Sequence, residues 1–332
     1  MHNFIGCRTS EWGHTFLAEG FGKVYALRSL AEGSALCVFD AHTLAPLGEY
    51  PTPGQHSCHI TLLQHQAVVA DYTSGTLSLY ELDADGIPAG EPMLVTFDGR
   101  GPHPQRQTSP HIHSSLLSHD GSTLWVVDLG TDRLYRFLVD DGRLVVEQRK
   151  TLRLPAGSGP RMCVESADGR YLYIVTELSD EVLVLGNNDC GVTDDTPRLL
   201  QRIPVSKGHP QGGGHIALSP DGRTLYVSQR VSGTAEGAHC PVPDGVAVFR
   251  VNVDATLTPL TYMATGLHPR HFCLSADGCL LCVACRDDNT LRMYAIDPSS
   301  GIPGSQVDSR TIPAPVFVAW KGCAADIVQV TR

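Results

Sequence analysis

The stretch SADGRYLYIVTELSDEVLVL (166–185) recurs along the chain in three related versions. These are SHDGSTLWVVDLGTDRLYRF (118–137), SPDGRTLYVSQR (219–230) and SADGCLLCVACRDDNTLRMYAI (275–296). Each begins with an Asp-Gly turn, which leads into an alternating apolar strand and then a polar loop, and all but the third version continue into a second strand. The turns are 48, 53 and 56 residues apart, counted between Asp120, Asp168, Asp221 and Asp277. A repeat of this length that contains only strands predicts a radial array of small sheets, a β-propeller.

The length of the chain sets the number of blades. At about 45–50 residues per blade, 332 residues accommodate about seven blades. We therefore predict an all-β fold, a seven-bladed β-propeller that occupies residues 1–332 as a single domain. The C-terminal segments 313–320 and 326–332 read as strands, and residues near Phe4 are expected to pair with them, which closes the ring and leaves no open sheet edge. The segment 233–245 interrupts the fifth blade and is predicted to form a loop over one face.

Composition excludes several kinds of partner. The formal net charge is −10, which argues against nucleic acid because a phosphate backbone requires a basic face. No apolar run approaches the ~20 residues that span a bilayer, and residues 1–16 lack the pattern of a signal peptide. The eleven cysteines are odd in number and scattered, which favours free thiols in a reducing cytoplasm. We predict a cytoplasmic protein that binds a small molecule, and the sequence leaves its oligomeric state open.

The blade pattern also predicts where functional side chains gather. In each blade the first strand starts at the end of the sheet where the second strand finishes, so residues at these two points share one face. This sequence places on that face His111, His113, Asp128, Arg161, Glu177, Arg230, Arg270 and Arg286. Guanidinium groups bind carboxylate or phosphate through paired hydrogen bonds, and a carboxylate among them can act as an acid or a base. This combination predicts a site for a small, anionic, oxygen-rich molecule.

Each of these residues also has an ordinary structural reading. An arginine can form a structural ion pair between blades, and a histidine in a strand is more often a packing residue than a catalyst. Their placement on one shared face is what favours the site. The C-x-x-C-x-x-C spacing of Cys279, Cys282 and Cys285 suits a metal poorly, because strand residues three apart point to opposite faces. The glycine run 211–215 opens a strand rather than a helix, so it is not a phosphate loop, and we predict no metal and no cofactor.

Five segments, taken in order, resemble a known family. They are GPHPQRQTSPHIHS (101–114), DLGTDRLYRF (128–137), GSGPRMCVESADGRYLYIVTEL (157–178), SPDGRTLYVSQR (219–230) and HPRHFCLSADG (268–278). The chain resembles the lactonase family of seven-bladed propellers, which includes the bacterial propeller-type 6-phosphogluconolactonases and the fungal 3-carboxy-cis,cis-muconate lactonising enzymes. The resemblance is strong from about residue 100 to 296 and weak before residue 60. It implies a site that contains His113 or His111, Arg161, Glu177 and Arg230.

The chain departs from the family pattern at five places, one of which is the loop 233–245, longer than usual in the family. Met162 follows Arg161 where the family usually has histidine, and Thr176 precedes Glu177 where asparagine is common. Glycines 212–214 replace an acidic residue, and Arg286 stands where a neutral amide is common. These departures bear on which substrate is recognised rather than on the scaffold.

The resulting hypothesis is a metal-independent hydrolysis of a sugar lactone, of the kind that 6-phosphogluconolactonases carry out. Glu177 is expected to activate water, with Arg161 and His113 stabilising the oxyanion that develops on the lactone carbonyl. Arg230 and Arg270 are expected to hold the phosphate or carboxylate of the substrate. The remaining predicted substrate-binding residues are His111, Asp128 and Arg286. Two alternatives stay open: a carboxymuconate-type lactonising cycloisomerase, and a non-enzymatic propeller that serves as a protein-binding scaffold.

Overall fold

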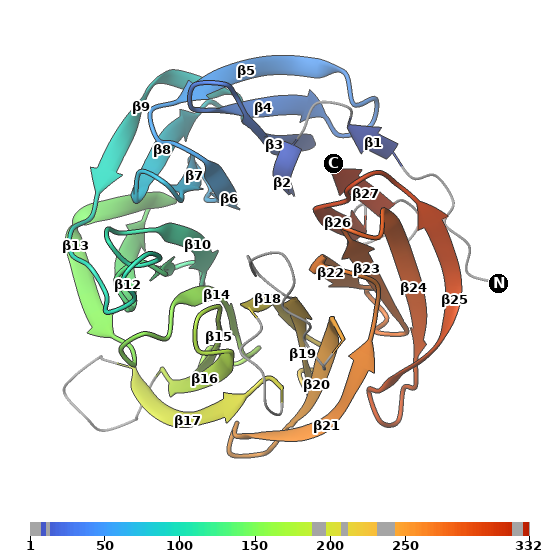
Figure 1. Ribbon diagram of the computed structural model, residues 1–332. Helices are drawn as coiled ribbons and strands as arrows, with labels where there is room; N and C mark the ends of the chain where they lie inside the picture. The colour runs from blue at the N-terminus through green and yellow to red at the C-terminus, as the bar shows by residue number, and fades with distance from the viewer. Residues whose placement is uncertain are drawn as a thin grey trace. The chain divides into compact units, whose positions relative to one another are not determined.

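A computed structural model describes residues 8–10, 14–187, 197–206, 212–230, 243–320 and 328–331. All the regular elements in these ranges are β-strands, β1 to β27, which confirms the all-β prediction (Figure 1). The described residues contain no helix that is long and apolar enough to cross a membrane. The chain divides into two compact units. We call Trp12–Cys163 the N-terminal unit, and Met1–Glu11 with Val164–Arg332 the C-terminal unit.

The N-terminal unit holds three four-stranded sheets, in each of which the strands follow one another in chain order. The first contains β2 (His14–Gly20), β3 (Lys23–Ser29), β4 (Ser34–Asp40) and β5 (Pro46–Thr52). The second contains β6 (Ser57–Leu62), β7 (Gln66–Asp71), β8 (Thr76–Leu82) and β9 (Pro88–Thr96). The third contains β10 (Ile112–Leu117), β11 (Thr123–Asp128), β12 (Arg133–Asp140) and β13 (Arg143–Arg153). All neighbouring strands in these sheets pair antiparallel.

Three further four-stranded sheets follow in chain order. The first contains β14 (Pro160–Glu165), which spans the boundary between the units, and then β15 (Tyr171–Thr176), β16 (Glu181–Gly186) and β17 (Arg198–Pro204). The second contains β18 (Gly212–Leu218), β19 (Thr224–Arg230), β20 (Gly245–Val251) and β21 (Leu257–Ala264). The third contains β22 (Pro269–Leu274), β23 (Leu280–Cys285), β24 (Thr290–Ile296) and β25 (Pro303–Thr311).

A three-stranded sheet joins the two ends of the chain within the C-terminal unit. β26 (Phe317–Trp320) pairs antiparallel with β27 (Val328–Thr331), and β27 pairs parallel with β1 (Arg8–Ser10). The expected pairing of the two terminal segments is therefore present, with β1 as the N-terminal partner. Phe4 and most of the predicted loop 233–245 lie outside the described residues.

The Asp-Gly turns have the same hydrogen-bonded structure in each repeat. At residues 118–123 the Ser118 hydroxyl donates to Asp120 Oδ1 (2.6 Å), and the Gly121 amide donates to the Ser118 carbonyl (2.9 Å). Gly121 has φ +72°, a conformation that glycine adopts without steric cost. The serine hydroxyl is the main reason why the pKa of the turn aspartate is lowered in all four repeats, at Asp120, Asp168, Asp221 and Asp277. These aspartates shape turns, as predicted.

The hydrophobic core lies between neighbouring sheets. In the N-terminal unit, Leu27 of β3 and Leu36 of β4 pack in one cluster with Val69 of β7, and all three are fully buried. Buried tyrosines on second strands connect neighbouring sheets. Each tyrosine hydroxyl donates to a backbone carbonyl of the following sheet, in the turn before that sheet's fourth strand. The pairs are Tyr25 with Gly86 (2.6 Å), Tyr173 with Ala255 (3.2 Å) and Tyr226 with Gly301 (2.6 Å). The phenol thus contributes apolar area to the core while its hydroxyl stays hydrogen-bonded.

The end of each sheet opposite the Asp-Gly turns is called here the loop end. In four of the six four-stranded sheets, one residue at this end holds the connection to the next sheet. Asp132 has φ +53° and accepts hydrogen bonds from the amides of Gly157 (2.7 Å) and Gly159 (2.8 Å). Its carbonyl also accepts from the Leu154 amide (2.9 Å). The carbonyls of the corresponding residues in later sheets accept equivalent bonds, at Asp180, Asp244 and Asn289. These residues hold the start of the next first strand in place.

Asp71, at the loop end of β7, supports a prediction about pH and stability. Its fully buried carboxylate accepts hydrogen bonds from hydroxyls, including those of Ser57 (2.5 Å) and Ser78 (2.7 Å). Burial raises the pKa of Asp71 to about 6, although these hydroxyls act to lower it. The folded state therefore binds more protons than the unfolded chain, whose aspartate pKa is about 3.9. Stability from this group is present below pH ~4 and is lost as the pH rises to ~6.

Asp71→Asn removes this titration. The free energy of unfolding of the wild type, minus that of the variant, is expected to fall by about 2 kcal/mol as the pH rises from 4 to 7. Urea denaturation of both proteins across this range measures the difference. Parallel stability curves would contradict the assignment.

Candidate active site

The residues predicted for the site fall at the loop ends of the sheets, in two groups. His111, His113, Asp128 and Arg161 belong to the N-terminal unit, whereas Glu177, Arg230, Arg270 and Arg286 belong to the C-terminal unit. Each group is described by itself.

A buried ion pair is the main feature of the C-terminal group. Glu177 directly follows β15 and Arg230 is the last residue of β19, so the two side chains come from neighbouring sheets. Arg230 Nη2 donates to Glu177 Oε2 at 3.2 Å, and the two side chains are only 4% and 5% exposed. A charge this deeply buried is retained only when it is paired, so each partner depends on the other.

Two glycines make room for this pair. Arg230 Nη1 donates to the Gly213 carbonyl (3.3 Å). A Cβ atom on Gly214 would lie 2.9 Å from the same nitrogen, and one on Gly213 would lie 2.6 Å from the Thr176 carbonyl oxygen. The strand assignment of this glycine run is confirmed, because β18 begins at Gly212. The run lets β18 approach β15 closely enough for Arg230 to reach Glu177.

The other two arginines of this group surround an acid and a histidine. Arg286, just after β23, donates to both oxygens of Asp287, from Nε (2.6 Å) and Nη2 (3.2 Å). Burial alone would raise the pKa of Asp287, but this hydrogen-bonded arginine and the nearby His268 and Arg270 lower it overall. Arg286 was predicted to bind substrate, and here its guanidinium is committed to Asp287.

In the N-terminal group, the two predicted histidines meet on a tyrosine. The His111 ring stacks on Tyr72 (centroids 4.6 Å apart, planes at 12°), and its Nδ1 lies 2.9 Å from the Tyr72 carbonyl oxygen. The His113 ring contacts the same tyrosine edge-on, with centroids 5.6 Å apart. In a regular strand, residues two apart face the same side, but β10 starts only at Ile112 and its register shifts between Ile112 and Ser114. The two rings come together through Tyr72 rather than through strand alternation.

Asp128 organises the loop end of its own sheet. Its carboxylate accepts from the backbone amides of His111 (2.8 Å) and Gly130 (2.9 Å) and from the hydroxyls of Thr131 and Tyr135. The side chain is fully buried, and burial raises its pKa. Asp128 was predicted to bind substrate, and the structure instead places its carboxylate against donors of its own loop and positions His111.

Arg161 is buried on β14, and its carbonyl accepts a hydrogen bond from the Ser114 hydroxyl (2.9 Å). Burial, and after it the charge of Arg161, lowers the pKa of His59 to about 3, which keeps that imidazole neutral at physiological pH. The N-terminal group therefore holds one buried cation, Arg161, with the neutral imidazole of His59 nearby. Such a group suits an oxygen atom that carries partial negative charge.

Known proteins show the same architecture. The family model described as "Lactonase, 7-bladed beta-propeller" matches residues 18–320. The chain belongs to this family. The 6-phosphogluconolactonase of Bacillus subtilis is 28% identical over 307 residues, which cover 91% of this chain and 82% of that protein.

The solved structures that are similar to this lactonase-family chain include the following two. The putative 6-phosphogluconolactonase from Bacteroides fragilis has a TM-score of 0.81 at 28% identity, over 91% of this chain and 85% of that one. The periplasmic gluconolactonase of Pseudomonas aeruginosa has a TM-score of 0.74 at 26% identity, over 88% of this chain and 83% of that one.

Sequence reasoning missed three residues at the loop ends of this lactonase-family fold: His59, Tyr72 and His268. Tyr72 follows β7, which has no Asp-Gly turn before it, so the repeat pattern did not mark Tyr72 as a loop-end residue. His268 was quoted in the motif HPRHF, but only its arginine was assigned a role. One signal was available, because His56, His111 and His268 occupy the same place, one residue before a first strand.

The cysteines confirm the strand argument. Cys282 and Cys285 both lie on the fully buried β23, and they belong to two different core clusters. Residues three apart therefore point to opposite faces of this strand. In the part of the chain that the structure describes, no three His, Cys, Asp or Glu side chains are grouped closely enough to hold a metal ion.

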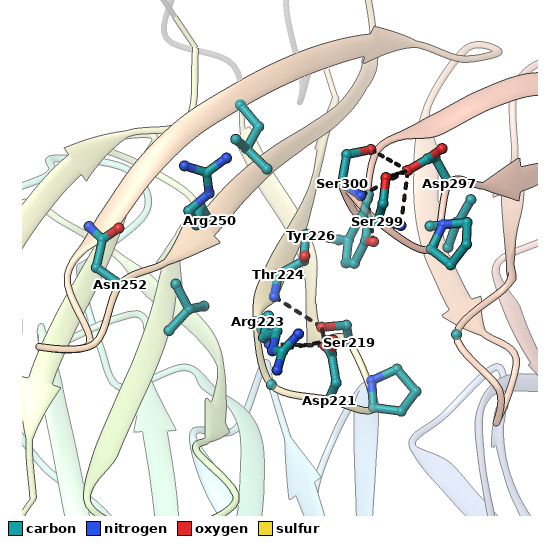
Figure 2. A pocket seen from close by; sticks show the side chains of 18 of the residues that line it. Ser219, Asp221, Arg223, Thr224, Tyr226, Arg250, Asn252, Asp297, Ser299 and Ser300 are labelled. Carbon is teal, nitrogen blue, oxygen red and sulfur yellow. Dashed lines mark hydrogen bonds and ion pairs between the residues drawn. The ribbon is translucent and has the colours of Figure 1, made fainter.

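A pocket of about 580 Å³ lies at the opposite end of the C-terminal unit, among the Asp-Gly turns. Figure 2 shows its polar lining, with one cluster formed by Ser219, Asp221 and Arg223 and another by Asp297, Ser299 and Ser300. The carboxylates of Asp221 and Asp297 accept hydrogen bonds from serines of their own turns (2.6 Å each). Because this pocket lies at the turn end of β19 and Arg230 at its loop end, the predicted site does not include it.

Proposed function

We propose that this chain hydrolyses the ester bond of a sugar lactone, with 6-phosphogluconolactone as the first substrate to test. The observation that carries the proposal is the buried Glu177–Arg230 pair, placed at the loop ends of two neighbouring sheets in a member of the lactonase family. The relatives that are named 6-phosphogluconolactonase support the substrate class.

The proposed reaction is attack of water on the lactone carbonyl. Glu177 accepts a proton from the water molecule while the water oxygen bonds to the carbonyl carbon. The Arg230 charge beside Glu177 favours the ionised carboxylate that this step needs. Arg161 and His113 stabilise the oxyanion, an effect of ~3–4 kcal/mol for a well-placed donor. The ring C–O bond then breaks, and the ring oxygen takes up the proton to give a hydroxy acid.

The anionic part of the substrate is assigned to Arg270, with Arg230 beside it. Arg270 is half-buried on β22, and its positive charge helps to lower the pKa of both His268 and Asp287. We assign no direct substrate contact to Asp128 or Arg286, because the Asp128 carboxylate accepts from Thr131 and Tyr135, and Nε and Nη2 of Arg286 donate to Asp287.

We further propose that β26, β27 and β1 form the seventh blade of the family's propeller, and that Arg161 and Glu177 act in the same reaction. The parallel pairing of β1 with β27 and the family's seven blades support this. The double variant Arg161→Ala/Glu177→Gln tests it. If the groups act together, the double variant loses about as much kcat as the worse single variant. Losses that multiply would contradict a shared role in one reaction.

A substrate panel separates the remaining possibilities. We expect turnover of 6-phosphogluconolactone and of D-glucono-δ-lactone, by a mechanism that survives treatment with a chelator. Turnover of a carboxymuconate alone would replace this proposal with the cycloisomerase. A scaffold protein would turn over neither compound and would lose nothing on double alanine replacement of Arg161 and Arg230.

We also propose a cytoplasmic location. The seven cysteines in the described ranges are all free thiols, which suits a reducing compartment. Cell fractionation tests this directly, and the periplasmic gluconolactonase among the similar structures makes the periplasm the relevant alternative.

A further inference from the structure

His268 is a buried histidine at the loop end of the C-terminal unit that none of the roles above uses. It precedes β22, is 7% exposed, and has a left-handed backbone with φ +55°. Its amide donates to Asp244 Oδ2 (2.7 Å), which fixes the backbone. Its Nδ1 lies 3.4 Å from Asp287 Oδ2.

The surrounding charges determine which ring nitrogen carries the hydrogen. Asp287 is held as a carboxylate by Arg286, so the nitrogen that faces it, Nδ1, carries the hydrogen of a neutral imidazole. The ring is neutral because burial, and after it the charges of Arg230 and Arg286, hold the pKa of His268 well below its usual range. The other nitrogen, Nε2, is therefore a hydrogen-bond acceptor.

Two buried polar atoms in this region complement each other. Among the described residues, neither His268 Nε2 nor Arg230 Nε has a hydrogen-bond partner, although both are buried. β19, which ends at Arg230, packs against β22, and Arg230 is the charged residue with the largest effect on His268. Arg230 Nε–H is a donor and His268 Nε2 is an acceptor. A hydroxyl group matches such a combination, because its oxygen accepts one hydrogen bond while its hydrogen donates another.

We propose that His268 Nε2 and Arg230 Nε–H together bind a hydroxyl group of the substrate, which makes His268 a specificity residue for polyhydroxylated lactones. The inference rests on the proposed role of the Glu177–Arg230 pair in lactone binding. It also separates the two enzyme hypotheses. A carboxymuconate carries carboxylates and no hydroxyl, and a carboxylate oxygen facing the Nε2 lone pair has no hydrogen to donate.

The kinetic test compares two lactones and two variants. His268→Ala is expected to raise KM for D-glucono-δ-lactone about tenfold, with kcat nearly unchanged, and to leave kcat/KM for the unhydroxylated δ-valerolactone within about twofold. His56→Ala is the matched control. His56 also precedes a first strand and has φ +51°, but it is exposed and pairs with Thr73, so both lactones should be unaffected. If His268→Ala lowered kcat/KM equally for both lactones, the proposal would be overturned.

A second readout does not depend on turnover. The ¹⁵N NMR spectrum of the wild type at pH 7 should show His268 as the neutral Nδ1–H tautomer, and D-gluconate should shift only its Nε2 resonance. A protonated ring, an Nε2–H tautomer or no response to D-gluconate would overturn the hydroxyl site. If the wild type failed to hydrolyse any lactone while this response was present, the proposed reaction would be wrong and the hydroxyl site would stand.

Discussion

Glu177→Gln is expected to lower kcat for the lactone substrate by about 10²–10⁴-fold and to leave KM within a fewfold of the wild type. The amide keeps the size of the side chain and an oxygen that can accept the hydrogen bond from Arg230, but it cannot take a proton from water. Steady-state kinetics with 6-phosphogluconolactone, or with whichever lactone the panel identifies, measures the loss.

The control for this variant is Glu181→Gln, four residues further along the chain. Glu181 also accepts a hydrogen bond from an arginine, Arg202 Nη2 (2.8 Å), but this pair is partly exposed on β16 and β17. The activity of Glu181→Gln should equal that of the wild type. If Glu177→Gln retained near-normal turnover, Glu177 would be removed from the mechanism.

Arg230→Met has the second large effect, this time on stability as well as activity. Removing the guanidinium leaves the Glu177 carboxylate buried and without the Arg230 ion pair, and the free energy of unfolding at pH 7 is expected to fall by about 3–5 kcal/mol. Arg202→Met, which breaks the more exposed pair with Glu181, should cost no more than about 1 kcal/mol. Urea denaturation of both variants measures the difference.

Two further measurements test whether the buried Glu177 carboxylate causes the loss of stability in Arg230→Met. The double variant Glu177→Gln/Arg230→Met should recover much of the lost stability but none of the activity, because it removes the charge and the catalytic group together. Loss of the Arg230 charge favours the neutral form of the buried Glu177 side chain, so the stability deficit of Arg230→Met should shrink as the pH falls from 7 towards 4. A deficit that was independent of pH and of the Glu177 substitution would contradict this explanation.

The blade repeat was predictable from sequence because its determinants are local. A serine two residues before aspartate, followed by glycine, closes a turn whatever surrounds it, as residues 118–121 and 275–278 demonstrate. Alternating apolar residues then define the strands, and β11, β15, β19 and β23 occur where this pattern placed them. The terminal pairing of β1 with β27 was predicted on a different ground, the cost of an open sheet edge.

The predicted site depended on distances that no local pattern encodes. The sequence placed Asp128 and Arg286 at the same ends of the sheets as Glu177 and Arg230. It did not indicate that Asp128 would turn towards His111 and Gly130, or that Arg286 would pair with the next residue, Asp287. A side chain at a loop end can point into its own loop or away from it, and packing decides between these orientations.

By itself, therefore, the sequence determined the strands, their turns and the end of each sheet that carries charged side chains, because these follow from contacts between residues close together in the chain. The tertiary structure decided that Arg230 reaches Glu177 past the glycines of β18, that His111 and His113 meet on Tyr72, and that His268 faces Asp287. In each of these contacts the two partners lie far apart in the chain, on different strands and loops. Their pairing depends on how closely neighbouring strands approach, which short stretches of sequence do not specify.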